Sequence, residues 1–249
     1  MSVAVSMLTN QTAIVLGTDA IGAGIATRFR REGGRVSVLG EDPASEHAVR
    51  LTDATAVAAA VSRAAKRMQG LNVLVINVLP PPRVAPLQSQ DDDAFETVFA
   101  RVRAAAAAMR SALAPMRVAG GGRIIVIGHR YGLTVNDGIA AYNAAAWALM
   151  GLARTAAVDW GQYQIASNVL VPFADTPELR DGRAQKPKLI DTLIGQIPLR
   201  RAGDPVEDIG GAAAFLASDA GAFINGEIVY ADGGQHTAGP VLIPALLRT

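Results

Sequence analysis

Six short apolar runs, separated by longer stretches with helical spacing, most restrict how this chain can fold. The runs are rich in Val, Ile and Leu, and they are Thr12–Gly17, Arg35–Leu39, Leu71–Val78, Arg123–Ile127, Ala166–Val171 and Glu227–Ala231. Strands that are apolar on both faces are typical of parallel sheets covered by helices on both sides. Right-handed crossovers between such strands give a doubly wound sheet. We therefore predict a single α/β domain over residues 1–249.

The stretches between the runs have the apolar spacing of helices. The expected helices are Ile21–Arg31, Ala54–Met68, Asp92–Met116, Ala140–Trp160 and Val206–Ser218. A further short strand is expected at Ala48–Leu51. It follows the run that ends at Leu39 so closely that a crossover helix between them is almost absent.

Composition excludes several classes of function. The 249 residues include no Cys, so disulfides, thiolate zinc sites and thiol catalysis are ruled out, and we expect no metal site. The net charge of +1 gives no reason to expect binding to nucleic acid or to an anionic membrane. There is no apolar stretch long enough to span a membrane, and residues 1–10 lack the features of a secretory signal. We expect a cytoplasmic protein.

Four segments make nearly the whole chain resemble the short-chain dehydrogenase/reductase family. They are the glycine turn at 17–22, the run at 70–77, the segment at 197–210 and the segment at 224–234, and the last two are the most specific. The resemblance implies a Rossmann-like domain with helices on both faces of the sheet, and oxidoreductase chemistry with NAD(P). Motifs of this kind identify a fold, whereas the chemistry depends on the site residues.

The catalytic residues of that family are mostly replaced here. Tyr142 matches the proton-donating Tyr of the family, but the place of the family's Lys, four residues on, holds Ala146. The place of the family's Ser holds His129, and the place of the Asn in the central helix holds Val102. A phenol without a cation nearby has a pKa of about 10 and is a poor acid–base catalyst at neutral pH. We predict that no residue is catalytic and that Tyr142 and His129 are vestiges of a site.

The cofactor motif is also incomplete. Gly17 and Gly22 match the first and third glycines of a dinucleotide-binding turn, but the turn is one residue short and its middle place has a side chain. Asn77 is what remains of the family's Asn-rich motif after the next strand. We predict that this chain binds no cofactor, with Gly17, Gly22 and Asn77 as vestigial binding residues, and that NAD(P) binds to a partner subunit.

These losses favour a non-catalytic subunit that forms a hetero-oligomer with an active paralogue, an alcohol or 3-hydroxyacyl-CoA dehydrogenase. The pattern is similar to that of inactive subunits in two-subunit family members, such as the hydroxybenzyl-succinyl-CoA dehydrogenase of anaerobic toluene degradation. The alternative is an active enzyme, a lyase, isomerase or cyclase, that uses His129 and Tyr142 without a nicotinamide.

Two Ala-rich helices are the expected contact surface. Ala runs occur at Ala104–Ala108 and Ala144–Ala146, and small side chains let helices of two subunits approach closely. The family assembles through these helices. We therefore expect an active paralogue, or a second copy of this chain, to bind through Asp92–Met116 and Ala140–Trp160.

Overall fold

The computed structural model describes residues 6–42, 47–130 and 137–237, which form one domain around a six-stranded parallel sheet. The strands are β1 (Thr12–Leu16), β2 (Arg35–Leu39), β3 (Val73–Ile76), β4 (Gly122–Ile127), β5 (Ile165–Pro172) and β6 (Ile228–Ala231). Their order is β2-β1-β3-β4-β5-β6, and every neighbouring pair is parallel. The chain reverses direction across the sheet after β2, so the predicted doubly wound fold is confirmed.

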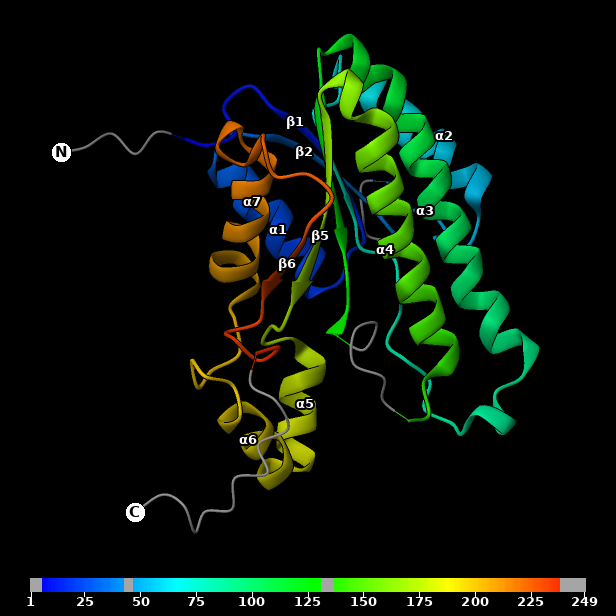
Figure 1. Cartoon of the computed structure of the whole chain (residues 1–249), viewed down its shortest axis with the longest axis vertical. Coiled ribbons are helices and arrows are strands. Elements are labelled where there is room, and N and C mark those ends of the chain that lie inside the picture. The colour runs from blue at the N-terminus through cyan, green and yellow to red at the C-terminus, as the bar shows by residue number, and fades with distance from the viewer. Residues whose placement is uncertain (1–5, 43–46, 131–136, 238–249) are drawn as a thin grey trace, which may run out of the picture.

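Helices cover both faces of the sheet (Figure 1). One face has α2 (Ala54–Arg67), α3 (Asp92–Val118) and α4 (Ala140–Trp160), and the other has α1 (Ala20–Arg31) and α7 (Gly210–Ala217). Side chains of each strand alternate between the two sides. In β1, Ile14 and Leu16 belong to the core under α2 to α4, and Ala13 and Val15 belong to the core under α1 and α7.

Two predicted elements differ from the structure. The expected strand at Ala48–Leu51 is a single parallel bridge between Gly40 and Ala48, because the chain enters a turn at Leu51 that leads to α2. The expected helix at Val206–Ser218 is divided into a π-helical turn at Pro205–Ile209 and α7. Two helices that were not predicted from the sequence, α5 (Pro177–Gln185) and α6 (Pro187–Gly195), lie beyond the carboxyl end of β5 (Figure 1).

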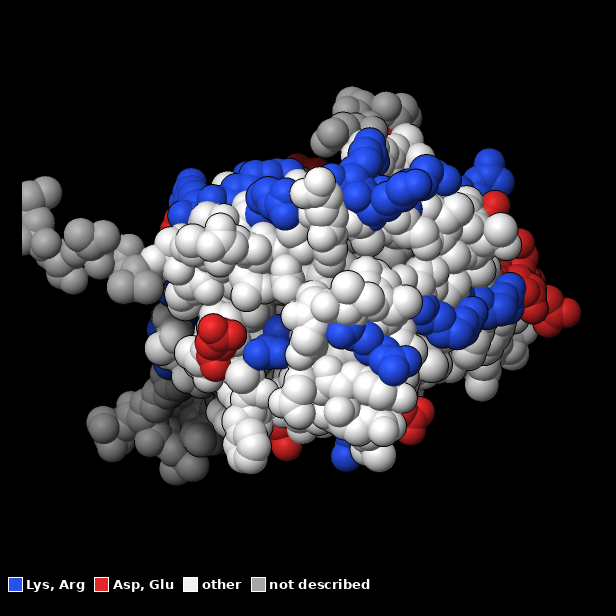
Figure 2. Space-filling view, turned by 90° about the horizontal axis from the view of Figure 1, so that it is seen from above, with Lys and Arg blue, Asp and Glu red and all other residues white. Residues whose placement is uncertain are grey.

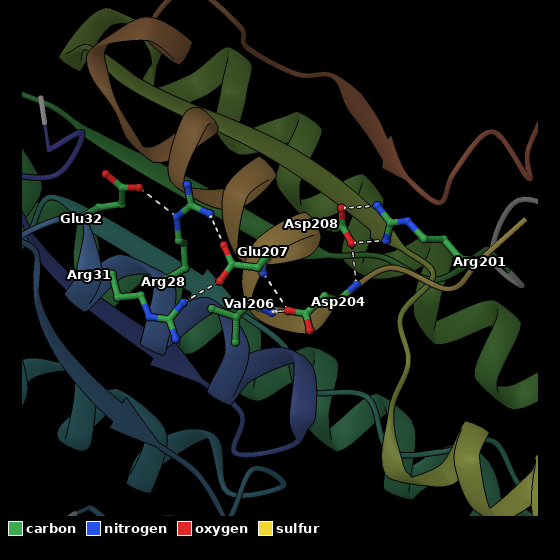
Figure 3. Close-up of polar contacts among 8 residues, drawn as sticks. All are labelled: Arg28, Arg31, Glu32, Arg201, Asp204, Val206, Glu207 and Asp208. Atoms are coloured by element: carbon green, nitrogen blue, oxygen red, sulfur yellow. Dashed lines mark hydrogen bonds and ion pairs between the residues drawn. The ribbon is translucent and has the colours of Figure 1, made fainter. Parts of the chain in front are cut away.

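Ion pairs connect the π-helical turn to α1 (Figure 3). The Glu207 carboxylate contacts Arg28 at 3.1 Å and Arg31 at 2.6 Å, and Arg28 also contacts Glu32 at 2.9 Å. All of these pairs are partly exposed, so each stabilises the fold by about 0 to 1 kcal/mol. Their main effect is to fix the orientation of α7 against α1.

A second cluster shapes the start of the same turn (Figure 3). The Asp204 side chain accepts hydrogen bonds from the backbone N–H groups of Val206 and Glu207, both at 2.8 Å. Asp208 accepts from the Asp204 backbone N–H at 2.6 Å and forms a two-pronged ion pair with Arg201. The hydrogen bond from Arg201 is the main reason that the pKa of Asp208 falls to about 2.

Two Asn side chains, one buried (Asn168) and one exposed (Asn225), attach β6 to the sheet. The Asn168 amide in β5 donates to the Ile224 carbonyl at 2.7 Å and accepts from the Glu227 backbone N–H at 3.0 Å. Asn225 accepts from the Ser167 backbone N–H at 2.9 Å and donates to a carbonyl at the end of α4. These contacts fix the turn before β6 in place, so that β6 pairs along β5 in register.

The edge at which the strands begin is basic. Figure 2 shows this face, where Lys and Arg side chains spread over the surface. Several of them come from the last turns of helices, where positive charge stabilises the helix dipole; these are Arg28, Arg30 and Arg31 of α1, Lys66 and Arg67 of α2 and Arg117 of α3. No helix within the described ranges is both long and apolar enough to cross a bilayer.

Candidate active site

Tyr142 and His129 come together at the carboxyl edge of the sheet. His129 follows β4, and Tyr142 lies in the first turn of α4. Their ring centroids are 5.4 Å apart with the ring planes nearly perpendicular, and Tyr142 is only 6% exposed. A segment that the structure does not describe, residues 131–136, connects the two elements. The structure therefore brings together the two candidate catalytic residues that the sequence singled out.

His129 is uncharged at neutral pH. Burial, and secondarily the positive charge of Arg130, lowers the pKa of His129 from 6.5 to about 4. A neutral imidazole has one N–H donor and one acceptor nitrogen. His129 can therefore donate a hydrogen bond to a substrate oxygen, as the hydroxyl of the replaced family Ser would.

The place of the family's Lys is apolar. Ala146 is 1% exposed and belongs to a small cluster with Ile139 and Tyr142, against which Leu79 packs. Val102, at the place of the family's Asn, lies in the main core. Neither position can supply a charge or hold a water molecule beside Tyr142, as the sequence predicted.

Gly17, Gly22 and Asn77 also meet at this edge. Gly17 has a φ of +122°, and a Cβ on it would lie 2.2 Å from the Asn77 carbonyl oxygen. A Cβ on Gly22 would lie 2.3 Å from the Gly17 carbonyl oxygen. The turn between β1 and α1 is thus tight, and both positions require glycine; it is where the family's dinucleotide-binding turn lies.

Asp19, which the sequence analysis did not single out, lies in that turn. It is the N-cap of α1, and its Oδ1 accepts a hydrogen bond from the Gly22 backbone N–H at 2.9 Å. The same oxygen accepts from the Asn77 side-chain amide at 2.7 Å. The signal was available, because Asp immediately before a helical run is a preferred N-cap.

Glu41, two residues after the end of β2, is engaged within the protein. Its Oε1 accepts from the Leu51 backbone N–H at 2.9 Å, and its Oε2 pairs with Arg101 at 2.7 Å. Arg101 also donates to the Val78 carbonyl at 2.9 Å. These contacts tie the end of β2 to α3 and to the chain that follows β3.

A hollow of about 580 Å³ lies at the opposite edge of the sheet. It is lined by residues at the starts of strands and the ends of helices, among them Gln11, Asn72, Gly121, Arg123 and Phe223. This is the edge seen in Figure 2, far from the carboxyl ends where Tyr142 and His129 lie. The hollow is not part of the candidate active site.

Acid is expected to destabilise the fold through His129. Its pKa is about 4 in the folded chain and about 6.5 when exposed, so the unfolded chain binds an extra proton between these values. The free energy of unfolding should fall by at most about 3 kcal/mol as the pH drops from about 6.5 to 4. Urea denaturation over this range should show a shallower pH dependence for His129→Gln than for the wild type. Parallel curves would show that His129 does not titrate in this way.

Comparison with known proteins defines the class. The family model described as enoyl-(acyl carrier protein) reductase matches residues 15–236. The oxidoreductase UcpA of Escherichia coli K12 is 30% identical, over 92% of this chain and 95% of its own. The cis-4-hydroxycyclohexanecarboxylate dehydrogenase of Sinomonas cyclohexanicum is 32% identical, over 89% of this chain and 86% of its own. The chain belongs to the short-chain dehydrogenase/reductase family.

Solved structures agree with this assignment. The aldohexose dehydrogenase of Thermoplasma acidophilum superposes with a TM-score of 0.85 at 25% identity, covering 96% of this chain and 99% of that one. A Beutenbergia cavernae structure, described as an NAD(P)-dependent gluconate 5-dehydrogenase, has a TM-score of 0.82 at 27% identity, covering 92% and 98%. That structure has NADP bound at low occupancy.

The predicted role as a non-catalytic subunit of a hetero-oligomer is wrong. Relatives that match about nine tenths of the chain are named as oxidoreductases and dehydrogenases. The same finding removes the alternative of a lyase, isomerase or cyclase without a nicotinamide. The error came from treating each replaced residue as a lost function, although His129 retains a hydrogen-bond donor next to Tyr142.

Proposed function

We propose that this chain is an oxidoreductase that interconverts a carbonyl and a hydroxyl group at the carboxyl edge of β4. One observation supports this above the others: Tyr142 and His129 are held 5.4 Å apart, ring edge to ring face, where β4 meets α4. Each has a polar group that can form a hydrogen bond to a substrate oxygen bound at this edge.

The two residues have different roles in this proposal. Neutral His129 donates a hydrogen bond from a ring N–H to the carbonyl oxygen and withdraws electron density from the carbonyl carbon. Tyr142 donates its phenolic proton to the same oxygen as the alcohol forms. When bound, a nicotinamide dinucleotide supplies the hydride.

The residues that would hold the cofactor form a tight turn but also place an unfavourable negative charge in it. The turn at Gly17 and Gly22, with Asn77, would hold the dinucleotide backbone, whereas Asp19 places a carboxylate among the same donors. We propose that the chain binds NAD(P)(H) with low affinity, which replaces the prediction that it binds none.

Turnover assays test the proposed function directly. The purified chain is mixed with NADH or NADPH at millimolar concentration and a panel of ketones, including 4-oxocyclohexanecarboxylate because one relative oxidises the matching alcohol. We expect oxidation of the dinucleotide that depends on both ketone and protein. If no ketone is reduced and no corresponding alcohol is oxidised, the proposed function is wrong.

We also propose that a second copy of this chain binds along α4. One face of the helix exposes mostly small or apolar side chains together with one Thr and one Arg, namely Ala144, Trp147, Gly151, Arg154, Thr155 and Val158. Trp147 is 51% exposed and Val158 is 81% exposed. In a two-fold pair with Gly151 near the axis, Trp147 of one copy would pack beside Thr155 of the other. This retains the predicted contact helix while replacing the paralogue with self-association.

Replacing Trp147 should weaken this association. We expect a Trp147→Glu variant to dissociate at concentrations at least tenfold higher than the wild type, since a buried aromatic side chain is a common interface anchor. Analytical ultracentrifugation measures the change. Phe223→Glu is the control, because Phe223 is fully exposed at another surface. A monomeric wild type, or equal dissociation of Trp147→Glu and wild type, would contradict the proposed interface.

A further inference from the structure

The Asp19 carboxylate occupies the donors that an anionic ligand would need. Its Oδ1 accepts from the Gly22 backbone N–H at 2.9 Å and from the Asn77 amide at 2.7 Å. The amino end of a helix is where backbone N–H groups and the helix dipole favour an anion. In this chain the anion is part of the protein.

Both the negative charge of the Asp19 carboxylate and its position matter for an anionic ligand. The first turn of α1 contains no acidic residue, so Asp19 at the N-cap supplies the negative charge at this helix end. The Asn77 amide comes from the end of β3, so two different elements hold one carboxylate oxygen. A pyrophosphate bound at the same place would lose both donors to Asp19 and would face a like charge within a few ångströms.

We propose that Asp19 is an internal competitor of the cofactor's pyrophosphate group and sets a low affinity for the dinucleotide. Binding then requires the carboxylate to leave the Gly22 N–H and the Asn77 amide. This inference rests on the proposed function, in that the carboxyl edge takes a dinucleotide, and it assigns Asp19 as an affinity-determining residue.

Asp19→Asn separates the charge of Asp19 from its structural role. Asn is about as good an N-cap as Asp, so the helix start is preserved while the negative charge is removed. Asp53→Asn is the matched control. Asp53 caps α2 in the same way, accepting from the Ala56 backbone N–H at 2.9 Å, and it is exposed like Asp19.

Calorimetric titration with NADPH, NADH and ADP gives the result. We expect Asp19→Asn to bind each of them about tenfold or more tightly than the wild type, and Asp53→Asn to match the wild type. The gain should shrink as salt is raised to about 1 M, where the Debye length falls to about 3 Å, because the effect is electrostatic.

Each outcome decides the inference. Equal affinity of Asp19→Asn and wild type, a gain that salt does not reduce, or no binding by any of the proteins would overturn it. The turnover assay distinguishes this from failure of the proposed function. If Asp19→Asn binds the dinucleotide more tightly but no ketone is reduced, the inference about Asp19 holds and the proposed function is wrong. If ketone is reduced but Asp19→Asn and wild type bind with equal affinity, the proposed function holds and the inference is wrong.

Discussion

Tyr142→Phe is expected to lower the rate of carbonyl reduction by about 100- to 10,000-fold while leaving the fold intact. The change removes one hydroxyl group, and with it the proton that the alcohol product requires; positioned acid–base groups contribute a factor of this size. The ring remains, so its packing with Ile139 and Ala146 is retained. Steady-state rates at saturating ketone and dinucleotide measure the loss.

Tyr163→Phe is the matched control for this prediction. Tyr163 lies between α4 and β5, where its ring contacts the Arg117 guanidinium at 4.1 Å, far from the carboxyl edge. We expect it to keep wild-type activity. His129→Ala should also lower the rate, because it removes the imidazole N–H that donates a hydrogen bond to the carbonyl oxygen. The alcohol formed from each ketone should stay the same. If Tyr142→Phe reduced ketones within twofold of the wild-type rate, the phenol could not be the proton donor.

Gly17→Ala is expected to destabilise the protein by about 3 to 5 kcal/mol, which is a large part of the stability of an ordinary domain. A methyl group there would lie 2.2 Å from the Asn77 carbonyl oxygen, so the end of β3 would have to move. The alanine would also be forced to a φ of +122°, a backbone conformation that residues with a side chain rarely adopt. Chemical denaturation followed by circular dichroism gives the loss.

Gly70→Ala separates the two causes. Gly70 also has a positive φ, +154°, but a Cβ on it would meet nothing within 4 Å. We expect this variant to lose about 1 to 3 kcal/mol of stability, from the strained backbone conformation alone. Equal losses at Gly17 and Gly70 would show that the contact with Asn77 adds nothing to the cost.

The sequence predicted the sheet well because its signals are local and strong. Runs such as Ile124–Ile127 are apolar at every position and end in Gly, which permits little besides a buried strand. Helix α5 was missed because it is short, exposed and without a clear apolar stripe. Helix α6 is equally short, but Leu189, Ile190, Leu193 and Ile194 have helical spacing, so its signal was available. The starts of both helices carried a different signal, since Pro177 and Pro187 both occupy the first turn of a helix.

The sequence singled out the residues that meet at the carboxyl edge of the sheet, but only as vestiges of a site. Tyr142, His129, Gly17, Gly22 and Asn77 were all identified, and the structure brings them to one edge of the sheet. What the sequence could not give is the environment that sets their chemistry. Burial makes His129 neutral, and neither that burial nor the hydrogen bond from Asn77 to Asp19 follows from spacing along the chain, because each depends on contacts between distant elements.

The attachment of β6 has a consequence for synthesis on the ribosome. Residues through β5 emerge well before residues 224–231, so during that interval the outer edge of β5 has no neighbouring strand. The Ser167 backbone N–H and the Asn168 amide, which later contact Asn225 and Ile224, are then open to pairing with any extended chain. A nascent chain is therefore exposed to aggregation at this edge, and translation of the last strand removes this hazard.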